Sequence, residues 1–87
     1  MNVYLLLEID CENNEEMCVS PCLKESFKNE RSAHAFAKQQ AEEWAKRLKD
    51  DCGVNVEVVL RSGIWTCIDP NDGYEKKFKV VEVPVLE

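Results

Sequence analysis

Residues 29–53 have the pattern of one complete amphipathic helix, and this segment constrains the fold more than any other. Asn29 is a residue type that caps helix N-termini, and Gly53 is the type that most often ends helices in the left-handed conformation. Between them, apolar side chains recur every three or four residues: Ala33, Phe36, Ala37, Ala41, Trp44, Ala45 and Leu48. We therefore expect this face, with Trp44 in the core, to pack against the rest of the chain.

The segments before the helix have the pattern of two β-strands. Residues 3–9 are apolar on both alternating faces, as expected for a strand in the middle of a sheet. Residues 17–27 can form a second strand, which contains Pro21. Because proline has no backbone N–H to donate, this strand is expected at a sheet edge or broken at Pro21.

Three further strands are predicted after the helix. Residues 54–61 alternate between apolar and polar side chains, as in a half-buried strand. Turn-forming residues at 62–63 and 69–73 then separate this strand from strands over residues 64–68 and 74–83. The 87 residues are therefore expected to form a single α+β domain, ββαβββ, in which one helix packs on an antiparallel sheet.

The net charge restricts the partners that the chain can bind directly. A formal charge of −6 argues against binding to nucleic acid or to anionic membranes. The acids are concentrated before the helix, with no base among them: Glu8, Asp10, Glu12, Glu15 and Glu16. No apolar run is long enough to span a bilayer, and the first residues lack the features of a secretion signal. We expect a cytoplasmic protein with a protein partner.

Five cysteines are many for a chain of this length. If the helix runs back along the sheet, four of them lie toward one end of the domain, where they could hold zinc or form a disulfide: Cys11, Cys18, Cys52 and Cys67. Their spacing is not that of a zinc ribbon, and buried or unreactive thiols are the favoured interpretation. We therefore expect folding without a metal or other cofactor.

Nothing in the sequence predicts catalysis. His34 is the only histidine, it has no evident acidic partner, and it lies too far from Cys52 along the helix to share a metal with it. The serines have no nucleophile motif around them, and the three glycines form no phosphate-binding loop. The protein is expected not to be an enzyme.

The number of apolar residues predicts an interface, because one helix covers only one face of a sheet. We assign the helix side to Val3, Leu5, Leu7, Ile9, Phe78, Val80 and the alternating series Val54, Val56, Val58 and Leu60. The opposite side then carries Tyr4, Leu6, Val59, Trp65, Val81 and Val83. This side is expected to bind a protein or a second copy of the chain. The centre of the binding surface is Trp65, with Tyr4 and Val81, and the acids of residues 8–16 flank it. The alternative is a different register, or loops that cover this side.

The start of the helix follows a strand and precedes Gly53 and three more strands. Its sequence, at residues 27–37, is Phe-Lys-Asn-Glu-Arg-Ser-Ala-His-Ala-Phe-Ala. This arrangement resembles small single-helix-on-sheet proteins of phages and mobile elements, some anti-CRISPR proteins among them. The resemblance covers most of the chain and implies a stoichiometric inhibitor whose acidic edge occupies a basic, nucleic-acid-binding surface of its partner. The alternative is a small cysteine-dependent metal-binding or redox-sensitive protein.

Overall fold

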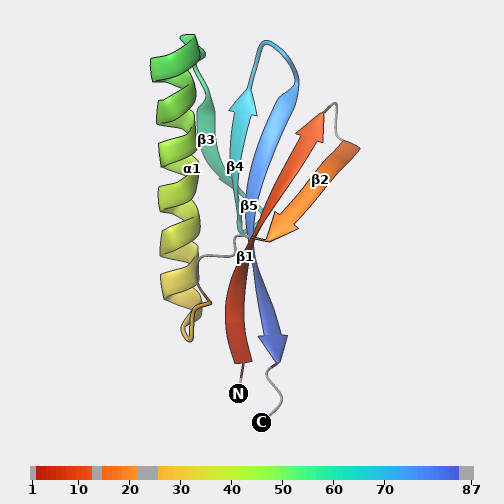
Figure 1. Cartoon of the computed structure of the whole chain (residues 1–87), viewed down its shortest axis with the longest axis vertical. Coiled ribbons are helices and arrows are strands. Elements are labelled where there is room, and N and C mark those ends of the chain that lie inside the picture. The colour runs from red at the N-terminus through yellow and green to blue at the C-terminus, as the bar shows by residue number, and fades with distance from the viewer. Residues whose placement is uncertain (1, 13–14, 22–25, 85–87) are drawn as a thin grey trace.

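One helix packs on a five-stranded antiparallel sheet (Figure 1). The structure, a computed structural model, describes residues 2–12, 15–21 and 26–84. The elements are β1 (Asn2–Glu12), β2 (Glu15–Pro21), α1 (Glu30–Cys52), β3 (Glu57–Arg61), β4 (Ile64–Asp69) and β5 (Tyr74–Pro84). The strands lie in the order β2-β1-β5-β4-β3, and every neighbouring pair is antiparallel. The predicted ββαβββ topology is confirmed.

Both predicted ends of the helix are present. The Asn29 side chain accepts hydrogen bonds from the backbone N–H groups of Arg31 and Ser32, at 2.8 and 3.3 Å. Gly53 is left-handed at φ 68°, and its N–H donates to the carbonyl oxygen of Lys49. Two residues thus satisfy backbone groups that a helix leaves unpaired at its ends.

Small residues bring α1 close to the sheet. Ala33, Ala37 and Ala41 are fully buried, and the last two pack with Leu6, Cys67 and Phe78 in the core. The Cys67 thiol donates a hydrogen bond to the carbonyl oxygen of Ala41, with 3.3 Å between Sγ and O. A side chain of β4 therefore touches the helix backbone, which larger residues on this face of α1 would prevent.

The first hairpin is shorter than predicted. β2 ends at Pro21 and lies at a sheet edge, which confirms the expectation for this proline. Residues 22–25 of the predicted strand lie outside the described residues. Phe27 forms an isolated antiparallel bridge with Tyr4, with backbone N–O distances of 2.7 and 2.9 Å.

The predicted faces of β1 are reversed. Leu6 packs against Ala37 and Ala41 and so lies on the helix side. Since neighbouring residues of a strand point to opposite faces, the alternate apolar residues lie on the far side of the sheet: Val3, Leu5, Leu7 and Ile9. Both sets are apolar, so alternation alone could not assign the buried face. The prediction therefore assigned the wrong one of the two sets to the helix side, which is an error of one residue along the strand.

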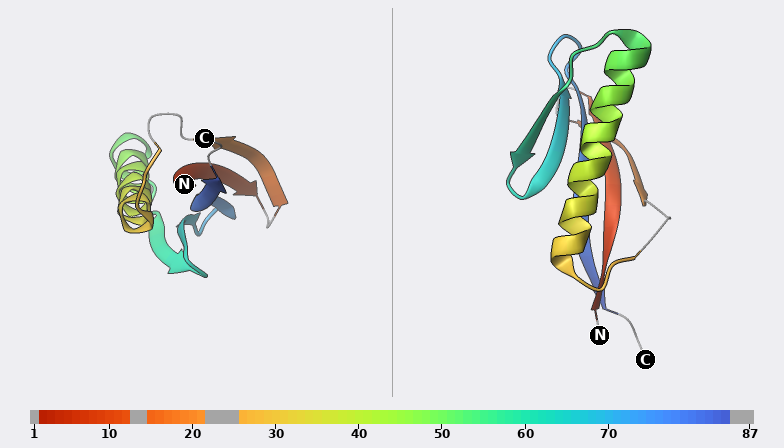
Figure 2. Two further views of the ribbon diagram at one scale, coloured as in Figure 1. Left: turned by 90° about the horizontal axis from the view of Figure 1, so that it is seen from below. Right: turned by 90° about the vertical axis from the view of Figure 1, so that its left-hand side faces the viewer.

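The far side of the sheet is not uniformly open. Ile9, Cys11 and Thr66 are buried there, although α1 covers only the other side. The sheet twists strongly, and β1 and β5 lie side by side throughout this twist (Figures 1 and 2). This twist lets side chains of the far face shield one another. Among the described residues, the only helix is too polar to cross a membrane.

Replacing Trp44 with alanine should test the packing of the helix. Trp44 is half-buried against the core, and its ring lies 5.8 Å from that of Tyr74. We expect the free energy of unfolding to fall by about 2–3 kcal/mol, somewhat less than for a fully buried ring. Urea denaturation measures the change, with Lys46→Ala on the exposed side of α1 as control. Equal stability of the two variants would contradict this packing.

Candidate protein-binding site

The acidic segment divides into two groups that lie on different surfaces. Glu8 and Asp10 are on the helix side of β1, where the Lys76 ammonium lies 3.8 and 3.6 Å from their carboxylates. The Tyr74 hydroxyl donates a hydrogen bond to Asp10, and burial together with this bond raises the pKa of Tyr74. These two acids already have partners within the domain, so they contribute little to an outer acidic surface.

The second group lies where β1 ends and β2 begins: Glu12 is the last residue of β1, and Glu15 and Glu16 are the first residues of the edge strand β2. Glu12, Glu15 and Glu16 are exposed, and β2 pairs only with β1 among the described residues. Two of the large apolar side chains that are most exposed also belong to β2: Met17 is 65% exposed and Val19 is 51% exposed. We call Glu15, Glu16, Met17 and Val19 the acidic edge.

A β-bulge sets the direction of Met17. The β1–β2 register passes from Asp10↔Cys18 directly to Cys11↔Glu16, so Met17 has no partner residue on β1. Bulges of this kind redirect side chains and interrupt regular pairing at sheet edges. Sequence analysis found the acids of this edge but not Met17, because a bulge leaves no mark in the alternation of residue types.

The predicted surface of Tyr4, Trp65 and Val81 does not form. Trp65 and Tyr4 both lie on the helix side, where the Lys38 ammonium is 5.5 Å from the Trp65 ring. Val81 is paired with Leu5 and faces the other side of the sheet. The error has the same origin as that in β1, because the sequence does not show which strand face is covered.

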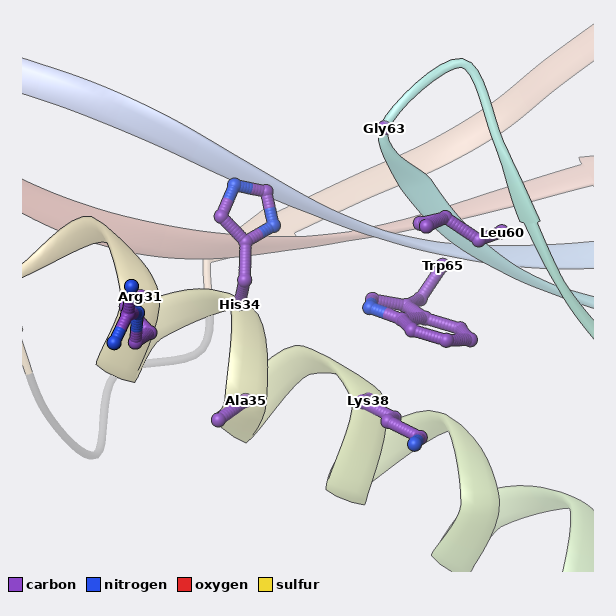
Figure 3. A pocket seen from close by; sticks show the side chains of 7 residues that line it. All are labelled: Arg31, His34, Ala35, Lys38, Leu60, Gly63 and Trp65. Atoms are coloured by element: carbon purple, nitrogen blue, oxygen red, sulfur yellow. The ribbon is translucent and has the colours of Figure 1, made fainter.

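Trp65 instead forms part of a pocket of about 400 Å³ between α1 and the β3–β4 hairpin (Figure 3). The residues that line it are Arg31, His34, Ala35, Lys38, Leu60, Gly63 and Trp65. Its walls are mainly apolar, and its lining includes three basic residues, Arg31, His34 and Lys38, and no carboxylate. Leu60, on the edge strand β3, is 57% exposed. We call this pocket the basic groove. The spacing of residues 31, 34 and 38 on one helix face was a signal for it that sequence analysis did not use.

His34 has an acidic neighbour, contrary to the prediction. Its Nε2 lies 3.6 Å from a carboxylate oxygen of Glu30, one helical turn earlier. Figure 3 shows the imidazole at the mouth of the groove, between α1 and the sheet.

The four cysteines do not meet at one point. Cys67 faces the helix and Cys11 the far side of the sheet, whereas Cys18 and Cys52 are exposed. Within residues 2–12, 15–21 and 26–84, no three His, Cys, Asp or Glu side chains are close enough together to hold a metal ion. Burial raises the pKa of the Cys67 thiol to about 11 and also raises that of Cys11. Both buried thiols are therefore poor nucleophiles.

Neither protein-family models, nor curated proteins, nor solved structures gave a match to this chain.

The buried Cys67 thiol should make the domain less stable in alkali. Its pKa is about 11 in the fold and about 9 for an unperturbed thiol, so the unfolded chain releases a proton that the folded chain keeps. From pH 9 to pH 11 this thiol should lower the free energy of unfolding by about 2 kcal/mol. Urea denaturation across this range measures the decline, which should be smaller for Cys67→Ala. Parallel curves for the two proteins would exclude this contribution.

Proposed function

We propose that this protein is a non-enzymatic binding module that engages a basic protein partner through its acidic edge. One observation carries the proposal: among the described residues β2 is an outer strand of the sheet, and exposed apolar and acidic side chains lie along it. Native proteins protect such edges with charges, prolines and bulges, and β2 has all three. Here Met17 and Val19 remain more than half exposed beside Glu15 and Glu16.

The two kinds of side chain have different parts in binding. Met17 and Val19 supply apolar surface that gains free energy when a partner removes it from water. Glu15 and Glu16 accelerate the encounter with a basic surface and repel acidic ones, which gives selectivity. Methionine is well suited to such a contact because its unbranched thioether adapts to partners of different shape.

A basic partner surface of this kind is typical of proteins that bind nucleic acid. By occupying that surface, the acidic edge would act as a stoichiometric inhibitor of nucleic-acid binding. The overall charge of −6 favours this role over direct binding to nucleic acid.

A peptide of alternating lysine and valine provides a defined test, because it complements the acidic edge in charge and in apolar spacing. Fluorescence anisotropy of the labelled peptide should report binding to the wild-type protein that weakens as sodium chloride is added. The double substitution Glu15→Lys with Glu16→Lys should weaken binding about tenfold or more. Asp50→Lys with Asp51→Lys makes the same charge change at exposed positions of α1 and should have little effect.

Met17→Ala separates apolar contact from charge. It leaves the net charge unchanged and should weaken peptide binding at every salt concentration. The variants Glu15→Lys with Glu16→Lys and Asp50→Lys with Asp51→Lys change the net charge equally. If both lose the same affinity for the peptide, the peptide responds only to overall charge and the proposed site is wrong. Circular dichroism of each variant confirms that the fold is kept.

A further inference from the structure

The two free edges of the sheet are complementary in charge. β2 and β3 lie at opposite ends of the strand order, and each pairs with one neighbour among the described residues. The exposed large apolar residues also belong to these two strands: Met17, Val19 and Leu60. The β2 edge is acidic, whereas the β3 edge borders the basic groove.

We propose that the basic groove receives β2 of a second copy of this chain. This inference rests on the proposed function, since it uses the acidic edge as a protein-binding segment, and it names a further partner for that edge. Among the described residues, β2 is the exposed extended segment that combines carboxylates with large apolar side chains. It therefore has the chemistry that the groove can bind.

The lining of the groove offers both an apolar surface and cations to the acidic edge. The pocket beside Trp65 and Leu60 is large enough for the Met17 side chain of the second copy, and a thioether packs favourably against an indole ring. Arg31 and Lys38, both on α1, line this pocket. Glu15 is paired with Glu12 and Glu16 with Cys11, so the two carboxylates point to opposite faces of β2, and one of them at a time can pair with these cations. Figure 3 shows Lys38 beside the Trp65 ring, so a carboxylate bound there also lies next to the apolar contact.

Charges already present at the groove weaken but do not cancel this attraction. Glu30 lies 3.6 Å from His34, and Glu42 lies 3.9 Å from Lys38. Both are exposed pairs within one helix, which bind weakly in water. Arg31 lines the groove directly, so incoming carboxylates meet at least this guanidinium in addition to Lys38.

The backbone of β3 adds a second kind of contact. Ser62 and Gly63 have φ values of 52° and 78°, the positive pair typical of a two-residue type I′ turn. Such a turn makes Arg61↔Ile64 a hydrogen-bonded pair, so the backbone N–H and C=O of Leu60 point away from β4. An added strand can bond to these free groups beside the groove.

The proposed contact is head-to-tail. It joins two different surfaces, so each bound copy still offers one free acidic edge and one free groove, and assembly continues beyond a dimer unless a ring closes. The net charge of −6 on each copy opposes association and keeps it weak. We therefore expect an assembly that grows with protein concentration rather than a dimer of fixed size.

Sedimentation velocity of the full chain tests this assembly. The mass of one copy is 10.0 kDa, and the average mass should rise past that of a dimer as the protein is concentrated. The alternating lysine–valine peptide should return the assembly to single copies, because it competes for the acidic edge. A protein that stays a single copy up to millimolar concentration would overturn the inference.

Two charge-reversed variants identify the surfaces. The groove variant carries Arg31→Glu with Lys38→Glu, which reverses the charge of the groove and should abolish assembly. The edge variant carries Glu15→Lys with Glu16→Lys, which reverses the charge of the acidic edge and should also abolish assembly. Mixed together, the two variants should associate again, because the intact acidic edge of the groove variant can bind the intact basic groove of the edge variant. Each variant alone should associate at least about tenfold more weakly than wild type.

Matched controls exclude a general effect of charge. Lys46→Glu with Arg47→Glu makes the same change as the groove variant at exposed positions of α1 and should still assemble. Assembly of the groove variant at wild-type strength, or a mixture that stays monomeric, would contradict the proposed contact. The groove variant keeps an intact acidic edge, so its binding to the basic peptide tests the proposed function separately.

Discussion

The close approach of α1 to the sheet is the constraint on which the rest of the structure depends. Ala33, Ala37 and Ala41 are fully buried, and the approach is close enough for the Cys67 thiol to reach the helix backbone. Larger side chains extend from the two borders of this alanine stripe. Trp44 packs on the Tyr74 side, while Lys38 lies over Trp65 on the other. The depth of the basic groove thus follows from the smallness of the residues beside it.

Sequence reasoning found the elements and their order because each has local chemical signals. Asn29 and Gly53 define the helix, Pro21 places β2 at an edge, and the turn residues separate the last three strands. Sequence reasoning failed to assign the two faces of the sheet, since β1 is apolar on both faces. Exchanging its faces changes no local residue pattern, so nothing in the sequence marks the face that the helix covers. Tyr4 and Trp65 were misplaced for this reason.

The candidate site was predictable only in part, for a related reason. The exposed acids were visible as a run of like charge, but the run did not show that Glu8 and Asp10 share one ion-pair partner, Lys76, far away in the sequence. The bulge at Met17 and the groove at Trp65 both arise from pairing between distant segments. Local residue patterns carry no information about such pairing, so a structure was needed to find these surfaces.

The pairing of β1 with β5 also has a consequence for how the chain is made. The two strands pair along their whole length, from Asn2↔Pro84 to Glu12↔Tyr74. During synthesis β1 emerges from the ribosome first, while its central partner emerges last. Until then β1, apolar on both faces, can pair only with the short β2 and has no sheet to cover it. The nascent chain is therefore exposed to aggregation and to chaperones until β5 is complete, and its long-range contacts predict slow folding.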